Sequence, residues 1–291
     1  MATSEKGLGL SLASSFFGHY AHCGFLCELE KAGVIPARIA GASAGALAGG
    51  MWAAGLRGTA LKDEILSFGF RRSFFDFSAV WRILGVLSWS YSPGIFEGSR
   101  MSKRLTDLFG ELQIEDLTEP RLDLAVANLS KSVGEIRSSG RLVDFIIASF
   151  SMPLVFCPRT INGERFLDGG ISNETPYAHW LDDPEVERIL VHKIRMESET
   201  PRGGFMNPGK VIAAIHEIPN AELEVYRRRH AEASGKELIF VETVQPAPGL
   251  VQSRKQGLVL FEAGAATARK WLEKQNGPSG FRTKPSSPDP R

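Results

Sequence analysis

The sequence has few of the features that mark disulfide-rich or zinc-binding proteins. Its 291 residues include only three cysteines, Cys23, Cys27 and Cys157. An odd number gives no disulfide framework, and Cys23 and Cys27 lack the second pair that would complete a zinc site. The cysteines are typical of small packing residues in a reducing compartment. We therefore expect a cytoplasmic protein with no metal and no cofactor.

An excess of charge of one sign is also missing. The chain carries 34 basic and 33 acidic residues, a net charge of +1. Proteins that bind nucleic acid usually show a clear basic excess, because they must neutralise phosphates. This balance argues against a nucleic-acid partner.

Long apolar runs are absent as well. Residues 7–27 and 39–56 contain no Asp, Glu, Lys or Arg, but both are rich in Gly, Ala and Ser. Neither offers the continuous span of about 20 apolar residues that a membrane helix needs, and no signal-peptide cleavage site follows an apolar run. We interpret both stretches as buried units of strand, loop and helix.

The first 56 residues alternate between strand and helix. We predict strands at residues 8–13 and 37–40, each followed by a helix, at 19–31 and from 44 to about 56. Such βαβ units are right-handed and build a parallel sheet. Further along we predict helices at 99–108, 142–149 and 261–272 and strands at 122–127, 159–161, 164–167, 189–192 and 238–241. From about Gln275 the chain is polar and rich in Pro and Ser, so we predict one domain over 1–274 and a disordered tail over 275–291.

A candidate nucleophile lies between the second strand and its helix. Gly41-Ala42-Ser43-Ala44-Gly45 fits the pattern G-x-S-x-G. In a nucleophile elbow a strand enters and a helix leaves, and the serine occupies a strained turn that flanking glycines such as Gly41 and Gly45 permit. The start of the helix, including Ala44, favours developing negative charge. The alternative is an incidental serine in a Gly/Ala-rich turn.

An α/β-hydrolase carries the same elbow, but its sheet normally needs several strands before the nucleophile, and 42 residues are too few. Such an enzyme also needs a histidine after the serine. The available candidates lie in no recognisable turn motif (His179, His192, His216 and His230).

Asp168-Gly169-Gly170 follows a predicted strand, 125 residues after Ser43. Together with the early G-x-S-x-G, this motif resembles the patatin-like phospholipases. Further segments resemble the family in the family order, namely "LCELEKAGVIPARIAGASAGALAGGMWAAGL", "SPGIFEGSRMSKRLTDLFG", "FIIASFSMPLVFCPRTINGERFLDGGISNETPYAHWLD" and "GLVLFEAGAATARKWL". The resemblance covers roughly residues 7–272.

The resemblance implies a three-layer α/β/α sandwich around a mostly parallel sheet. It also implies a serine lipid acyl hydrolase in which Ser43 is the nucleophile and Asp168 the base, without histidine. Such a dyad needs a desolvated Asp168 within hydrogen-bond reach of Ser43 Oγ, and Gly169 and Gly170 would let its loop approach closely. Phospholipase A, lysophospholipase and esterase activities are not separated by the sequence.

One segment departs from the family pattern. After the first strand the family has a glycine-rich loop whose N–H groups form the oxyanion hole, whereas this chain reads Ser14-Ser15-Phe16-Phe17-Gly18. A left-handed Phe16 would be costly. Either Ser14, Ser15 and Phe16 still present N–H groups, together with Ala44 and with or without the help of a serine hydroxyl, or the hole is lost and the protein is a weak enzyme or a lipid-binding derivative. A lipid acyltransferase is a third alternative.

Aromatic residues are concentrated in one segment. Nine of them, a third of the chain's total, lie between Phe68 and Phe96, interleaved with Arg71, Arg72 and Arg82. Rings flanked by arginine suit the headgroup boundary of a membrane, whereas a packed layer above the sheet explains the same pattern. The sequence leaves a peripheral membrane contact, an acyl-chain pocket and a core layer all open.

Overall fold

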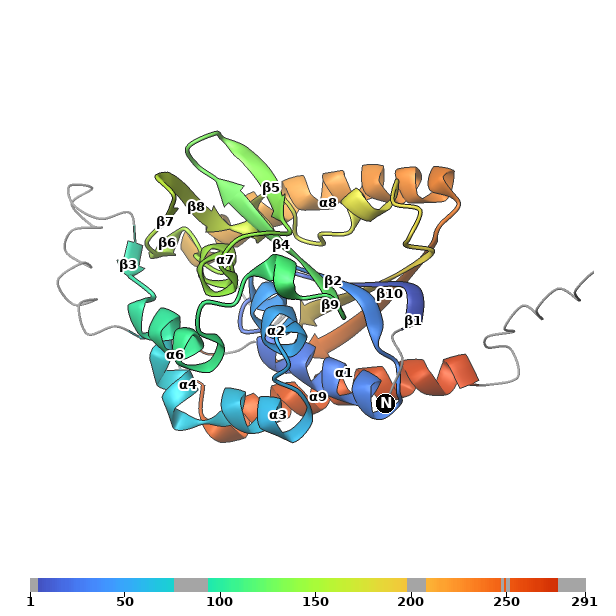
Figure 1. Ribbon diagram of the computed structural model, residues 1–291, viewed down its shortest axis with the longest axis horizontal. Coiled ribbons are helices and arrows are strands. Elements are labelled where there is room, and N and C mark those ends of the chain that lie inside the picture. The colour runs from blue at the N-terminus through green and yellow to red at the C-terminus, as the bar shows by residue number, and fades with distance from the viewer. Residues whose placement is uncertain (1–4, 76–93, 198–207, 247–248, 250–251, 277–291) are drawn as a thin grey trace, which may run out of the picture.

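The computed structural model describes residues 5–75, 94–197, 208–246, 249 and 252–276 (Figure 1). Its centre is an eight-stranded sheet in the order β10-β9-β1-β2-β4-β8-β7, with β5 paired to β4. These strands are β1 (Glu5–Leu12), β2 (Pro36–Gly41), β4 (Arg121–Asn128), β5 (Val133–Arg137), β7 (Arg159–Ile161), β8 (Glu164–Asp168), β9 (Arg188–Met196) and β10 (Glu237–Gln245). A separate two-stranded sheet pairs β3 (Gly94–Phe96) with β6 (Leu154–Phe156).

The sheet is mostly parallel, as predicted. β10, β9, β1, β2 and β4 run parallel to one another, whereas β5 and β8 pair antiparallel with β4, and β7 pairs antiparallel with β8. The carboxyl ends of β1 and β2 lie side by side, because Leu12 pairs with Gly41. β8 runs the opposite way beside β4, and its last residue Asp168 pairs with Val126. The loops after β1, β2 and β8 can therefore meet.

Helices cover both faces of the sheet (Figure 1). One face carries α1 (His19–Lys31), α2 (Ala44–Ala53), α3 (Gly58–Leu66), α4 (Phe68–Ser73), α6 (Ser99–Phe109), α7 (Leu142–Ser149) and α9 (Arg254–Asn276). The other face carries α8 (Pro208–Ser234) and a smaller apolar cluster that includes Tyr177, Trp180 and Ala231. Short 3-10 turns are η1 (Ile114–Asp116), η2 (Gly169–Ile171) and η3 (Ala178–Trp180). The predicted three-layer α/β/α sandwich is confirmed.

The main core lies between the sheet and the larger helical layer. Every residue of α2 is buried, as expected for a helix that is apolar on all sides. α1 and α9 pack with their backbones almost in contact. A Cβ on Gly24 would lie 2.0 Å from the Phe261 carbonyl oxygen, and one on Gly264 would lie 1.9 Å from that of Ala21. Glycine at these two positions lets α9 close the layer over α1.

Several predicted boundaries change. α9 begins at Arg254 and ends at Asn276, so the predicted domain end at 274 falls inside a helix, and residues 277–291 lie outside the described residues. α2 ends at Ala53, not near 56, because Gly55 turns the chain with a φ of +94°. The strands predicted at 159–161 and 164–167 form a hairpin, β7 and β8, whose turn has positive φ at Asn162 and Gly163. Helices α3, α4 and α8 and strands β3, β5 and β6 were not predicted from the sequence.

Within the described ranges, no helix combines the length and the apolar character that crossing a membrane requires.

Candidate active site

Ser43 occupies a sharp turn between β2 and α2. Its φ of +52° and ψ of −115° are unusual for a residue with a side chain. Such a turn is possible here because its neighbours lack a Cβ: one on Gly45 would lie 2.1 Å from the Leu12 carbonyl oxygen, and one on Gly41 would lie 2.5 Å from that of Gly45. The strained geometry is that of a nucleophile elbow.

A second serine supports this turn, and the sequence analysis did not identify it. The N–H of Ser43 donates to Ser149 Oγ over 3.0 Å, and that hydroxyl donates to the Ala125 carbonyl over 2.7 Å. Ser149 is fully buried at the end of α7. It ties the elbow to β4 and uses the Ser43 N–H, which is thus not available to a substrate. No motif in the sequence marks a single serine at a helix end for this role.

Asp168 lies against the nucleophile. Ser43 Oγ donates a hydrogen bond to Asp168 Oδ2 over 2.6 Å, and the N–H of Gly170 donates to Oδ1 over 2.7 Å. The close approach depends on Gly169, where a Cβ would lie 2.0 Å from the Ala125 carbonyl oxygen. The two side chains are thus well within the separation that the predicted dyad requires.

Burial sets the proton affinity of this carboxyl group. Only 4% of Asp168 is exposed, and desolvation raises its pKa from 3.8 to about 6. The hydrogen bonds from Ser43 and Gly170 oppose the rise, because they favour the charged form. Among the described residues no arginine or lysine forms an ion pair with Asp168. A carboxylate with a pKa near 6 is a far better base than an ordinary aspartate.

The histidines that an α/β-hydrolase would need are engaged elsewhere. His179 contacts Asp123, His230 contacts Asp182, and His192 bonds to His22. The side chain of His216 lies outside the described residues. The hydrogen bond of the Ser43 hydroxyl is to an aspartate.

The loop after β1 corrects one prediction about the oxyanion hole. Ser14 donates its N–H to the Glu174 carbonyl over 2.8 Å, so Ser14 cannot also donate it to a substrate. No hydrogen bond in the described part of the chain uses the N–H groups of Ser15 and Phe16. The expected strain is displaced by one residue, because Phe17, not Phe16, has a positive φ of 52°.

The remaining predicted donor is Ala44. Its N–H is the first of α2, where a backbone N–H has no acceptor within its own helix. Ser15, Phe16 and Ala44 line the same cavity as Ser43. The geometry thus brings three of the four predicted oxyanion residues to the nucleophile.

A buried asparagine of α8 holds the loop of Asp168 at two points. Asn220 Nδ2 donates to the Gly170 carbonyl over 2.9 Å, and Asn220 Oδ1 accepts from the N–H of Glu174 over 3.2 Å. Glu174 in turn holds Ser14. The asparagine thereby braces the loop of Asp168, and the Glu174 carbonyl of that loop contacts the loop after β1. The sequence analysis missed it, because α8 was not predicted and Pro219 precedes the asparagine inside that helix.

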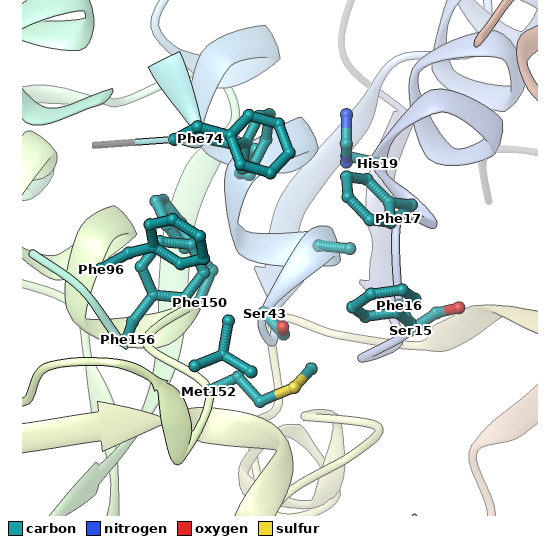
Figure 2. A pocket seen from close by; sticks show the side chains of 14 residues that line it. Ser15, Phe16, Phe17, His19, Ser43, Phe74, Phe96, Phe150, Met152 and Phe156 are labelled. Atoms are coloured by element: carbon teal, nitrogen blue, oxygen red, sulfur yellow. The ribbon is translucent and has the colours of Figure 1, made fainter. Parts of the chain in front are cut away.

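Ser43 opens into an apolar cavity of about 150 Å³ (Figure 2). Phe16 and Phe17 stand on one side of it and Phe74 at one end, and Figure 2 shows Met152 near Ser43 at the other. Seven phenylalanines contribute to the lining, and the polar lining residues are Ser15, His19 and Ser43 (the phenylalanines are Phe16, Phe17, Phe74, Phe75, Phe96, Phe150 and Phe156). This cavity suits a hydrocarbon chain attached to a carbonyl at Ser43.

The aromatic segment between Phe68 and Phe96 has mixed uses. Phe70 is buried in the core, Phe74, Phe75 and Phe96 line the cavity, and 67% of Phe68 is exposed. The other aromatic residues of the segment lie outside the described residues (Phe77, Trp81, Trp89 and Tyr91). In the described part of the segment, a core layer and a cavity wall therefore coexist.

Comparison with known proteins gives a family match over the region that holds the site. The family described as "Patatin-like phospholipase" matches residues 10–179, more than half of the chain. This range begins in β1 and includes the elbow, the loop of Asp168 and every residue that lines the cavity.

Individual relatives are longer proteins. A lysophospholipase NTE1 of Meyerozyma guilliermondii is 27% identical over 217 residues, which cover 75% of this chain and 14% of the relative. The neuropathy target esterase sws of Drosophila melanogaster is 29% identical over 176 residues, covering 59% of this chain and 12% of the relative. The crystal structure of VipD from Legionella pneumophila has the same fold, with a TM-score of 0.55, 16% identity, and coverage of 94% of this chain and 67% of that one.

Proposed function

Because this chain belongs to the patatin-like phospholipase family, we propose that it is a lipid acyl hydrolase that uses Ser43 as nucleophile and Asp168 as its only base. The relatives named lysophospholipase and neuropathy target esterase support an acyl ester of a lipid, with a lysophospholipid as the first substrate to examine. The chain spans only a small part of the length of those relatives.

The first half-reaction forms an acyl-enzyme. Asp168 takes the proton of the Ser43 hydroxyl as its oxygen attacks the ester carbonyl, and the N–H groups of Ser15, Phe16 and Ala44 stabilise the oxyanion. The tetrahedral intermediate collapses and the carbon–oxygen bond to the alcohol breaks. Asp168 returns the proton to the departing alcohol, while the acyl group stays on Ser43.

The second half-reaction releases the fatty acid. Asp168 takes a proton from a water molecule, whose oxygen attacks the acyl carbonyl. The bond to Ser43 Oγ then breaks, and the serine recovers its proton from Asp168. Both halves need an ionised Asp168, which its pKa of about 6 allows at neutral pH.

The observation that carries this proposal is the 2.6 Å hydrogen bond between Ser43 Oγ and Asp168 Oδ2 at the end of an apolar cavity. A protein that only bound lipid would need the cavity but not a strained serine against a desolvated carboxylate. This favours the enzyme over the binding derivative, although the loop after β1 has lost most of the family's glycines.

Product analysis tests the proposal. We expect the purified protein to release fatty acid from lysophosphatidylcholine, and the Ser43→Ala variant to release none above background. A wild type that acts neither on lysophosphatidylcholine nor on diacyl phospholipids and simple esters would refute it. Adding an excess of lysolipid or glycerol as acceptor separates hydrolysis from acyl transfer, because a transferase would convert the acceptor into an acylated product.

We also propose a peripheral membrane contact through a groove between α4 and α6. This groove of about 280 Å³ is lined by four basic residues and one acidic residue, with Phe68 at its side (the charged residues are Arg72, Arg100, Lys103, Arg104 and Asp107). Two of these basic side chains form ion pairs, Arg104 with Glu64 and Lys103 with Asp107. An exposed ring beside basic side chains fits an anionic lipid surface.

Vesicle flotation tests this contact. We expect binding to vesicles that contain an anionic phospholipid, and loss of binding when Phe68→Ser and Lys103→Glu are combined. Arg229→Glu, on the exposed face of α8 across the sheet, is the control with the same change of charge. If the double variant and Arg229→Glu bind the vesicles equally well, or if the wild type does not bind them, the groove is not a membrane contact.

A further inference from the structure

Two buried histidines form a chain of hydrogen bonds that ends at the loop after β1. His22 Nε2 lies 2.9 Å from the Ala13 carbonyl oxygen, and His22 Nδ1 lies 2.9 Å from His192 Nδ1. His192 Nε2 lies 2.8 Å from Thr243 Oγ1. His22, His192 and Thr243 have no exposed surface, and they come from α1, β9 and β10.

The partners determine where each proton lies. A carbonyl oxygen can only accept, so His22 must carry its proton on Nε2. Burial lowers the pKa of His22 to about 4, so the ring is neutral near pH 7 and its Nδ1 must accept. His192 therefore carries its proton on Nδ1, and its Nε2 accepts from the Thr243 hydroxyl. Every link of the chain is satisfied in one arrangement only.

His192 holds both backbone groups of Ala13. Its own carbonyl accepts the Ala13 N–H over 3.1 Å, and its side chain, through His22, holds the Ala13 carbonyl. The next residue, Ser14, is fixed by Glu174. The residues immediately after are Ser15 and Phe16, which line the cavity beside Ser43 and whose N–H groups form no hydrogen bond with the described residues.

We infer that His22 and His192 are positioning residues for the oxyanion hole, holding the start of a glycine-poor loop so that the Ser15 and Phe16 N–H groups stay directed at the substrate carbonyl. This inference rests on the proposed function. A displacement of about 1 Å at a catalytic group can lower a rate about 100-fold, so fixing Ala13 matters even though neither imidazole contacts the substrate.

The test compares an ester with its thionoester, 4-nitrophenyl butyrate and 4-nitrophenyl thionobutyrate. Sulfur is a weak hydrogen-bond acceptor, so a thionoester gains little from an oxyanion hole and the ratio of the two rates reports on that hole. A variant that is merely less folded loses both rates equally. The ratio therefore separates positioning from stability.

For His22→Leu we expect the kcat for the ester to fall at least about tenfold with a KM within about threefold, and the ester-to-thionoester ratio to fall by a similar factor. His22→Gln keeps a donor for Ala13 and should retain most of the ratio. Thr243→Val should lower it less than His22→Leu. His179→Gln removes a hydrogen-bonded imidazole bound to Asp123, away from the loop, and should change the melting temperature but not the ratio.

An unchanged ratio in folded His22→Leu would overturn the inference. If that variant does not fold, Thr243→Val decides in the same way. A wild type that hydrolyses neither ester refutes the proposed function and this inference together, whereas an active wild type with an insensitive ratio refutes the inference alone.

Discussion

Two loops meet at Ser43, and they use glycine very differently. The loop of Asp168 keeps both its glycines, and a Cβ on Gly169 would collide with the Ala125 carbonyl oxygen at 2.0 Å. The loop after β1 carries serine and phenylalanine where the family has glycines, and among these only Phe17 has a positive φ. Glycine is thus indispensable where backbones touch, and replaceable where the chain has room for a side chain.

Two of the residues that replace glycine in the loop after β1 also shape the cavity. Phe16 and Phe17 form part of the wall of the cavity beside Ser43, with ring centroids 4.6 Å apart (Figure 2). The two histidines behind the loop supply a hold on Ala13 that does not depend on glycine. The comparison predicts that the loop of Asp168 tolerates no change, whereas the loop after β1 tolerates changes of side chain.

The largest expected effect concerns the carboxylate. Asp168→Asn keeps the shape of the side chain but removes the base, and kcat should fall by about four orders of magnitude, as for the loss of a member of a catalytic triad. Asp123→Asn is the matched control, since Asp123 is also buried but is bonded to His179, Trp180 and Ser138. Steady-state kinetics on a soluble ester measure both. Similar losses in the two variants would mean that Asp168 is only structural.

The next prediction compares the effect on kcat of one substitution in each loop. Gly169→Ala forces apart the loop of Asp168 and β4, and we expect kcat to fall at least about 100-fold, because the base moves away from Ser43. Ser15→Ala should change kcat by less than about threefold if Ser15 donates through its backbone N–H. A large loss in Ser15→Ala would instead assign the donor to the serine hydroxyl.

A smaller effect follows from the pKa of Asp168. Its protonation removes the base, so kcat/KM should be constant above about pH 7 and fall about tenfold per pH unit well below pH 6. The rate should be measured on an uncharged ester across this range. A profile that stays flat down to pH 4.5 would mean that Asp168 is not desolvated as described.

The stability of the fold should respond to pH as well. Burial lowers the pKa of His19 to about 3 and of His22 to about 4, and it also lowers that of His192. These groups bind protons in the unfolded chain below pH 6.5 but not in the native chain, so stability is lost as the pH falls through 6.5. The raised pKa of Asp168 acts in the opposite sense between about pH 6 and 3.8.

The net effect of these groups is a loss of about 2 to 3 kcal/mol per pH unit between pH 6 and 5, from about two protons. Urea unfolding at several pH values measures it. His192→Phe should reduce the slope of the unfolding free energy against pH by the equivalent of about one proton. An unchanged slope would mean that His192 does not stay neutral in the native state. This pH dependence is one of stability. Measuring activity only at pH values where the protein is fully folded separates it from the loss of activity caused by protonation of Asp168.

Much of this arrangement could be predicted from the sequence, because local signals coincide with the fold. The early βαβ pattern predicts the parallel sheet, and the resemblance to the patatin-like phospholipases implies that Ser43 and Asp168 approach each other. The structure adds the 2.6 Å distance between Ser43 Oγ and Asp168 Oδ2 and the apolar cavity beside Ser43. The catalytic roles stay a prediction until they are tested by kinetics.

The residues that the sequence did not reveal act through tertiary contacts. Ser149 reaches the elbow from α7, Asn220 reaches Gly170 from α8, and His192 reaches His22 of α1 from β9. None belongs to a local motif, and α8 carries no strong periodic signal. The assignment of Ser14 to the oxyanion hole was wrong for the same reason, since the Glu174 carbonyl that occupies its N–H lies 160 residues further along the chain.

The central claim is that Ser43 is a nucleophile activated by Asp168, and one labelling experiment tests it most directly. The protein is treated with a fluorophosphonate and the adduct is located by peptide mass spectrometry. The account predicts one adduct on Ser43 in the wild type, none on that peptide in Ser43→Ala, and a strongly slowed reaction in Asp168→Asn. A wild type that stays unlabelled, or that reacts at Ser43 equally fast without the Asp168 carboxylate, would contradict it.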